Sequence, residues 1–370
     1  MNANQHLHRL GQSVWLDNIT RGMLQSGSLQ QYINEYAVTG LTSNPTIYEQ
    51  AIRNSNFYDD AIREKSAEGK SGADLFFELA LEDLTQAADL FDTIHKATMG
   101  VDGWVSLEVS PQLVNDVDAT IREAIYLHDR AQRENLFIKI PGTAAGITAI
   151  EEVIFSGVPV NVTLLFSPEQ YFAAASAYMR GIERRLVAGL SPKVASVASV
   201  FISRWDVAVN NKVPESLNNK LGIAIAQRTY RSYLELLNSS RWRDLAHAGA
   251  PVQRLLWAST GTKDPAASDT LYVEALAAPD TVNTIPEKTL LAFADHGVVG
   301  QIMSPDGGTF EQQIAAFTEA GVAVDALASR LQLEGAESFA KSWAELLAMI
   351  SIKSATLANG EVTQQRERVV

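Results

Sequence analysis

Short runs of apolar, largely β-branched residues alternate along this chain with longer stretches of helical character. Alternation of this kind predicts a parallel sheet that is covered by helices. The number of strand-like runs favours a closed barrel over an open doubly wound sheet. The predicted strands are SVWLD (13–17), GLTSN (40–44), WVSLEV (104–109), LFIKI (136–140), VNVTLLF (160–166), VASVASVFI (194–202), QRLLWAST (253–260) and TVNTIP (281–286).

The stretches between these runs are predicted to be helices. One of them begins with SPEQY, where Ser167 can cap the helix, Pro168 suits the first helical position and Gln170 stands at the capping-box position. Five such helices are predicted between the strands, over residues 75–94, 115–133, 144–155, 169–186 and 223–237.

Two parts of the chain exceed what a plain barrel needs. The insertion between the second and third strands (45–103) has room for two or three helices, and two further helices are expected at 309–331 and 337–352. A barrel of this type usually takes roughly 250 residues, and this chain has 370. We therefore predict an α/β (β/α)₈ TIM barrel with extra helices in that insertion and at the C-terminus. Residues 1–370 are expected to form one barrel domain with a C-terminal helical extension.

Polar side chains recur on one face of several predicted strands, near their C-terminal ends. Because side chains alternate along a strand, the apolar set would face the helices and the polar set the barrel interior. Barrel enzymes keep their chemistry at that end. The alternative is a buried polar network that satisfies itself, which fits single residues better than the whole set. The residues that share a face are Trp15 with Asp17, Thr42 with Asn44, Ser106 with Glu108, Phe137 with Lys139, Asn161 with Thr163, and Ser199 with Phe201 and Ser203.

Lys139 stands out because it interrupts an otherwise apolar strand. A buried ammonium is costly, and the neutral amine favoured by burial is the form that attacks carbonyl groups. The alternative interpretation is a structural ion pair of Lys139 with Asp17 or Glu108.

Composition and charge narrow the function further. The chain has no cysteine, which excludes disulfides, thiolate nucleophiles and cysteine-bound metals. Its net charge of −13 argues against a nucleic-acid partner, and it requires any phosphate site to rely on a few local cations. The N-terminal MNANQHLHRL does not resemble a signal peptide, and no run approaches the roughly 20 apolar residues of a membrane helix. We therefore expect a cytoplasmic protein without a membrane partner.

Several blocks of sequence together resemble the transaldolases, over about residues 13–286. They are SVWLDNITRGML, GLTSNPTIYEQAI, VSLEVSPQL and NLFIKIPGTAAGITAIEEVIFSGVPVNVTLLFSPEQY, and the last is the most specific. The chain length resembles the longer bacterial branch of that family. The resemblance implies transfer of a dihydroxyacetone unit between a ketose phosphate and an aldose phosphate, in the non-oxidative pentose phosphate pathway. It also implies a class I aldolase-type barrel with neither a metal nor a cofactor, as a monomer or homodimer.

The resemblance also assigns catalytic roles to four residues. Lys139 corresponds to the Schiff-base lysine, and Asp17 to the residue that exchanges a proton with the substrate hydroxyl. Glu108 and Thr163 correspond to the pair that holds a catalytic water.

Five further residues correspond to substrate-binding positions. Asn44 and Asn161 match side chains that hydrogen-bond the sugar, and Ser199 and Arg204 match a serine and a phosphate-binding arginine. The shorter forms have a Ser-Phe-Arg motif on the seventh strand, whereas this chain reads WASTGTKDP. Lys263 is therefore assigned to the second phosphate contact, although lysine lacks the bidentate fork of arginine.

Three other functions are weighed against this one. A fructose-6-phosphate aldolase would release free dihydroxyacetone, but those sister enzymes carry tyrosine where this chain has Phe201. A noncatalytic sugar-phosphate sensor would not need a buried lysine near two carboxylates. A nucleotide enzyme is suggested by PGTAAG (141–146), but the G-x-G-x-x-G fingerprint is absent. The six histidines do not form an H-E-x-x-H motif.

Overall fold

The computed structural model describes the backbone of residues 1–368 and the side chains of residues 1–358. Its centre is one sheet of eight parallel strands in the order β2-β1-β8-β7-β6-β5-β4-β3. Neighbours in the sheet are consecutive in the chain, except that the first strand pairs with the last, as in a barrel whose strands are joined by helices. The strands are β1 (Ser13–Leu16), β2 (Val38–Leu41), β3 (Val105–Glu108), β4 (Leu136–Pro141), β5 (Val160–Leu165), β6 (Ser196–Phe201), β7 (Arg254–Ala258) and β8 (Val282–Ile285).

The two edge strands, β2 and β3, meet and close the sheet into a barrel. Leu41 N donates to Trp104 O and Gly103 N donates to Thr39 O, each over 2.9 Å. Gly40 permits this approach, because a Cβ atom there would lie only 2.7 Å from Trp104 O. The predicted (β/α)₈ barrel is therefore confirmed.

The second strand lies earlier in the chain than its predicted range of 40–44, so that prediction was wrong. β2 ends at Leu41, and Asn44 caps the next helix by accepting a 3.1 Å hydrogen bond from Ile47 N. Because Pro45 takes the first helical position, residues 42–44 become a short loop between strand and helix.

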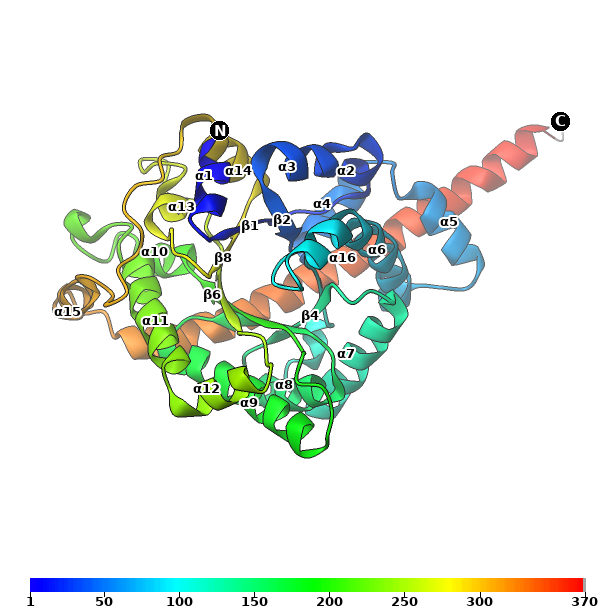
Figure 1. Cartoon of the computed structure of the whole chain (residues 1–370). Helices are drawn as coiled ribbons and strands as arrows, with labels where there is room; N and C mark the ends of the chain where they lie inside the picture. Colours follow the sequence, from blue (N-terminus) through cyan, green and yellow to red (C-terminus); the bar gives the residue numbers. More distant parts are fainter. Residues whose placement is uncertain (369–370) are drawn as a thin grey trace.

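Helices surround the barrel in chain order (Figure 1). The five predicted between strands are confirmed, and Ser167 caps α9 by accepting from Gln170 N. Three helices fill the insertion between β2 and β3, as its length suggested. The helices up to β8 are α1 (Ala3–Arg9), α2 (Arg21–Ser26), α3 (Ser28–Tyr36), α4 (Pro45–Asn54), α5 (Asp59–Ala67), α6 (Gly72–Ala97), α7 (Val117–Ala131), α8 (Ala144–Ser156), α9 (Pro168–Val187), α10 (Ser203–Val209), α11 (Leu221–Leu237), α12 (Ser240–His247) and α13 (Leu271–Ala275), with short 3₁₀ turns at Pro111–Leu113 and Glu215–Leu217.

Two apolar clusters reflect the alternation along the strands. Outward residues such as Leu136, Ile138 and Ile140 of β4 pack against the helices in the larger cluster. Phe137, between them, belongs to the second cluster inside the barrel, where it stacks on Trp104 at 4.0 Å between ring centres. Lys139 shares the inward face of Phe137, as the alternation predicted.

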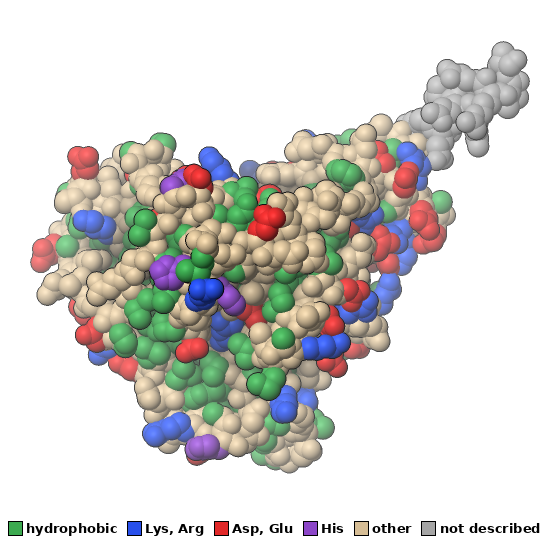
Figure 2. All heavy atoms as spheres, turned by 45° about the horizontal axis from the view of Figure 1, so that its top comes forward, with side chains coloured by type: hydrophobic (Ala, Val, Ile, Leu, Met, Phe, Trp, Pro, Cys, Tyr) green, Lys and Arg blue, Asp and Glu red, His purple; other side chains and the backbone are tan. Residues whose placement is uncertain are grey.

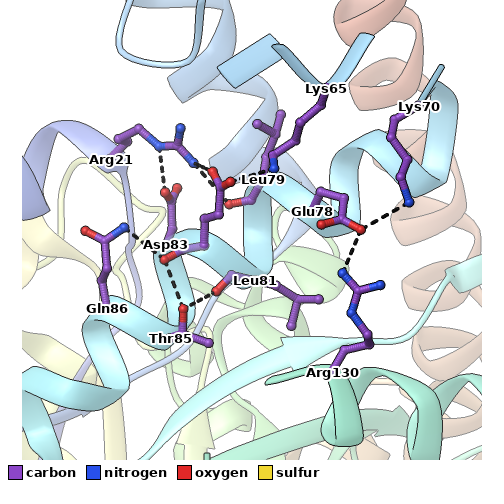
Figure 3. A network of polar contacts seen from close by, with 11 residues as sticks. Arg21, Lys65, Lys70, Glu78, Leu79, Leu81, Asp83, Thr85, Gln86 and Arg130 are labelled. Atoms are coloured by element: carbon purple, nitrogen blue, oxygen red, sulfur yellow. Dashed lines mark hydrogen bonds and ion pairs between the residues drawn. The ribbon is translucent and has the colours of Figure 1, made fainter. Parts of the chain in front are cut away.

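A buried polar network connects the segment after β1 to the insertion helices (Figure 3). Arg21 donates from Nε to Asp83 Oδ1 and from Nη2 to Glu82 Oε2, both over 2.8 Å. Tyr58 OH donates to Asp83 Oδ2, also over 2.8 Å. The network therefore fixes the start of α2, four residues after Asp17, against α6.

The C-terminal region differs from its prediction. After β8 come α14 (Glu287–His296) and α15 (Phe310–Glu319), and then α16 (Val324–Arg368) as one long helix. The predicted helix at 309–331 is interrupted near Gly321, which has φ +88°, whereas the predicted break between 331 and 337 does not exist. The predicted break was wrong. Glycine weakens a helix locally, but Gly335 lies buried inside α16, where its backbone closely approaches Leu164 and Arg204.

The long helix α16 passes behind the ring of strands in Figure 1 and covers the C-terminal end of the barrel. Gln332 Nε2 donates to Gly142 O, after β4, and to Leu164 O, in β5, each over 3.0 Å. The same helix contacts α4, α5 and α6 on the other side of the barrel. Residues far along the chain therefore form part of the barrel mouth.

The described residues include no helix of sufficient length and apolar character to cross a membrane. On the face drawn in Figure 2, acidic and basic side chains are interspersed around the edge, and hydrophobic ones gather toward the middle. That face thus carries no continuous basic surface.

Candidate active site

Lys139 lies on the inner face of β4 and is 7% exposed. Its Nζ donates a 2.8 Å hydrogen bond to Ser43 O, in the loop after β2. In the sheet, Lys139 pairs with Glu108 of β3 on one side and Asn161 of β5 on the other. No carboxylate oxygen lies within 4 Å of Nζ among the described residues, so Lys139 is not held in a direct ion pair.

Asp17 directly follows β1 and faces the same interior. Thr42 Oγ1 donates to Asp17 Oδ1 over 3.0 Å, and the Thr42 and Thr284 hydroxyls lie 2.7 Å apart. Burial raises the pKa of Asp17, while the charge of Lys139 and the Thr42 hydrogen bond oppose that rise. A raised pKa makes the Asp17 carboxylate a stronger proton acceptor than an ordinary aspartate.

Glu108 and Thr163 each hold a buried oxygen without a partner. Glu108 Oε2 and Thr163 Oγ1 form no hydrogen bond to the described protein groups. Burial raises the pKa of Glu108, and Asp17 raises it further, against Lys139 and Arg204. Buried polar atoms normally find a partner, so these two oxygens are suited to bind substrate or water. Thr163 lies at a bulge of β5, where Leu164 takes φ +57°.

Asn161 is held by hydroxyl groups of its neighbouring strands. Ser199 Oγ donates to Asn161 Oδ1 over 2.6 Å, and Asn161 Nδ2 donates to Ser106 Oγ over 3.3 Å. Asn161 is completely buried. This chain of hydrogen bonds fixes the floor of the site, and Ser199 is the member that lines the cavity.

The cationic side of the site comes from two loops. Arg204 is the second residue of α10, and Lys263 lies in the loop after β7. Neither has a carboxylate within 4 Å among the described residues. Burial lowers the pKa of Arg204, yet a guanidinium stays charged at neutral pH. Two cations without anionic partners would suit a phosphate group.

One cavity of about 140 Å³ brings most of these groups together. Glu108 and Asn161 do not line it, since Asn161 lies beneath the floor and Glu108 borders a separate cavity of about 20 Å³. The cavity also includes Thr284 and Phe339, which the sequence reasoning missed. Seven predicted site residues line it: Asp17, Asn44, Lys139, Thr163, Ser199, Arg204 and Lys263.

Comparisons with known proteins identify the family. Residues 14–350 match the family model described as "Transaldolase/Fructose-6-phosphate aldolase". The chain belongs to the transaldolase/fructose-6-phosphate aldolase family. It is 43% identical to a transaldolase of Saccharopolyspora erythraea, covering 94% of this chain and 97% of that protein. It is 42% identical to a transaldolase of Mycolicibacterium smegmatis (92% and 94% covered) and 39% identical to transaldolase 2 of Nostoc sp. (91% and 93% covered).

The transaldolase/fructose-6-phosphate aldolase family includes two enzymatic activities, and the side chain of Phe201 helps to distinguish them. Its ring lies in the cavity wall, 5.5 Å from the ring of Phe166. A phenyl ring at this place offers no hydroxyl group to the substrate. The described residues contain no group of three or more His, Asp or Glu side chains arranged to hold a metal ion.

Proposed function

We propose that this protein is a transaldolase that carries a dihydroxyacetone unit on Lys139. The observation that carries the proposal is a buried amine at the barrel mouth, in one cavity with Asp17 and with two cations that have no ion-pair partner among the described residues. The donor would be sedoheptulose 7-phosphate or fructose 6-phosphate, and the acceptor glyceraldehyde 3-phosphate or erythrose 4-phosphate. This transfer belongs to the non-oxidative pentose phosphate pathway.

The first half of the reaction forms the covalent intermediate. Neutral Lys139 attacks the C2 carbonyl of the ketose, and the resulting carbinolamine loses its hydroxyl as water to give an iminium. Glu108 and Thr163 would handle that water, because both have buried oxygens without a protein partner. The raised pKa of Glu108 favours its protonated form more than in an ordinary glutamate, which suits a group that gives and takes a proton.

The second half transfers the three-carbon unit. Asp17 accepts the proton of the C4 hydroxyl, the C3–C4 bond breaks, and its electrons move into the iminium to form an enamine. The aldose phosphate leaves, and the enamine attacks the aldehyde carbon of the acceptor while Asp17 returns the proton. Addition of water to the new iminium then releases the ketose and regenerates the Lys139 amine.

The remaining cavity residues would orient the sugar. The carboxamide oxygen of Asn44 is occupied by the cap of α4, so its amide nitrogen is the half that can donate to a hydroxyl. Ser199, held by Asn161, would present its hydroxyl to the same chain. Arg204 and Lys263 would bind the terminal phosphate, and remote binding energy of this kind can orient the reacting carbons. A cytoplasmic monomer or homodimer is our expectation from the sequence.

Borohydride trapping tests the proposal directly. After reduction in the presence of fructose 6-phosphate, mass spectrometry should find a dihydroxyacetone adduct on Lys139, and K139M should give none. An unmodified Lys139 with full activity would refute the mechanism.

A second measurement separates transfer from aldolase cleavage. With erythrose 4-phosphate present, a transaldolase forms sedoheptulose 7-phosphate and little free dihydroxyacetone. Release of free dihydroxyacetone at the rate of turnover would instead favour fructose-6-phosphate aldolase.

A further inference from the structure

The Arg204 guanidinium lies beside a pair of aromatic rings that come from distant parts of the chain. Its Cζ is 5.2 Å from the ring centre of Phe201, at the end of β6, and 5.6 Å from that of Phe339, in α16. The two rings are 6.4 Å apart and inclined at 61°. Phe339 lines the cavity that also contains Lys139, so the contact belongs to the substrate site.

These aromatic contacts restrain Arg204 without occupying its N–H groups. The described protein offers Arg204 no carboxylate within 4 Å and no hydrogen-bond acceptor. An arginine side chain loses considerable rotamer entropy when it is fixed. Attraction to the aromatic rings restrains the guanidinium and leaves its N–H donors free for an incoming anion.

The approach of α16 to Arg204 depends on Gly335, one turn before Phe339. A Cβ atom at Gly335 would lie 2.8 Å from Leu164 Cδ2 and 3.1 Å from Arg204 Nη1. Glycine inside a helix costs about 1 kcal/mol relative to alanine, yet here it lets the helix backbone lie against the arginine. Gly335 and Phe339, one helical turn apart, thus both lie against the Arg204 side chain.

We propose that Phe339 is a positioning residue for the substrate phosphate, which holds the Arg204 guanidinium in the orientation that binds it. The inference rests on the proposed function, in which Arg204 binds that phosphate. It makes α16 part of the phosphate site, although the helix supplies no charge there. It also predicts that removal of the ring weakens phosphate binding more than it slows the chemistry at Lys139.

The test uses the full-length enzyme and two readouts. Calorimetry with inorganic phosphate measures binding without turnover, and only binding that disappears in R204M is counted. F339A should raise this dissociation constant about three- to tenfold, as expected for one cation–π contact. In assays with fructose 6-phosphate, KM should rise by a similar factor while kcat changes less than about twofold.

Two further variants distinguish the proposal from simple coverage of the cavity. F339W keeps an aromatic face and should bind phosphate within about twofold of the parent, whereas F339L keeps apolar volume and should resemble F339A. L333A, on the exposed side of α16, is the matched control and should leave both readouts unchanged.

Three results would overturn the proposal: unchanged phosphate binding in F339A, F339L binding as tightly as the parent, or a fall in kcat at constant KM. Failure of the proposed function would look different, because R204M would then bind phosphate normally.

Discussion

Thr42 Oγ1 donates a 3.0 Å hydrogen bond to Asp17 Oδ1, from the loop after β2 to the residue after β1. The hydroxyl stabilises the ionised form of the carboxylate, which accepts the substrate proton in the proposed mechanism, and it opposes the rise that burial imposes on the Asp17 pKa. The Thr42 hydroxyl is in turn 2.7 Å from that of Thr284 in β8. Side chains from three neighbouring strands or their loops thus form a hydrogen-bonded series that ends at the Asp17 carboxylate.

The T42V variant should therefore shift the pH dependence of catalysis. Without the hydroxyl, the pKa of Asp17 rises, so the acid limb of kcat/KM moves to higher pH. On that limb kcat/KM for fructose 6-phosphate should fall about tenfold, as expected for loss of a hydrogen bond to a charged group. The loss should diminish in alkaline buffer. T39V on β2 is the matched control, and an equal loss at all pH values would contradict the assignment.

Loss of the Lys263 charge should weaken substrate binding and leave chemistry largely intact. Lys263 is exposed and has no ion-pair partner in the described part of the chain. Because solvent and salt screen its charge, K263M should raise KM for fructose 6-phosphate only about three- to tenfold. R204M should raise KM by more than tenfold, because a bidentate arginine binds phosphate more strongly. K96M, which removes an exposed lysine in α6, controls for net charge. Equal KM values for K263M and K96M would remove Lys263 from the site.

Asp206 should make the stability of the protein depend on pH. It accepts hydrogen bonds from Leu221 N and from Tyr272 OH, and burial raises its pKa to about 6 from 3.8. A raised pKa in the folded state means that this residue's contribution is most favourable below about pH 4. The contribution declines as pH rises to about 6, by about 3 kcal/mol in total.

Urea unfolding of the parent and of D206N measures this effect. Because asparagine does not titrate, the free energy of unfolding of the parent relative to D206N should fall between about pH 4 and 6. A constant difference between the two proteins over this interval would show that Asp206 titrates as an ordinary carboxyl.

The buried network around Asp83 should be important for stability. D83N leaves the Arg21 guanidinium without its most buried partner, and loss of one member of a buried ion pair costs about 3–5 kcal/mol. D89N, which removes the exposed ion pair with Arg133, should cost less than about 1 kcal/mol. Denaturant midpoints compare the two. Similar midpoints for D83N and D89N would show that the network contributes little.

The barrel could be predicted from the sequence because its strands and helices are marked by local patterns, namely side-chain alternation and capping residues. Alternation within LFIKI placed Lys139 inward and its apolar neighbours outward, and Ser167 and Pro168 marked the start of α9 correctly. The range of the second strand failed because Thr42 and Asn44 look like strand residues until Asn44 is seen as a helix cap. The single helix α16 was missed because Gly335 resembles an interruption, and only its contact with Arg204 explains it.

The site was only partly predictable for a similar reason. Rules that apply along a strand found Asp17, Lys139 and Thr163, and applied to TVNTIP they would also have found Thr284. No such rule reaches Phe339, which is more than a hundred residues from Arg204 in the chain and lies in a different kind of element. Its place in the cavity depends on how α16 crosses the barrel, which is a property of tertiary packing.

Because α16 is the last helix of the chain, its position also determines when the barrel mouth is completed during synthesis. A nascent chain that has released all eight strands already contains Lys139 and Asp17, and domains can start to fold before translation ends. It still lacks Gln332, which contacts Gly142 after β4 and Leu164 in β5, and the second ring beside Arg204. The cavity around Lys139 is therefore complete only after the last part of the chain has been synthesised, and an unfinished barrel would expose Lys139 before Phe339 reaches Arg204.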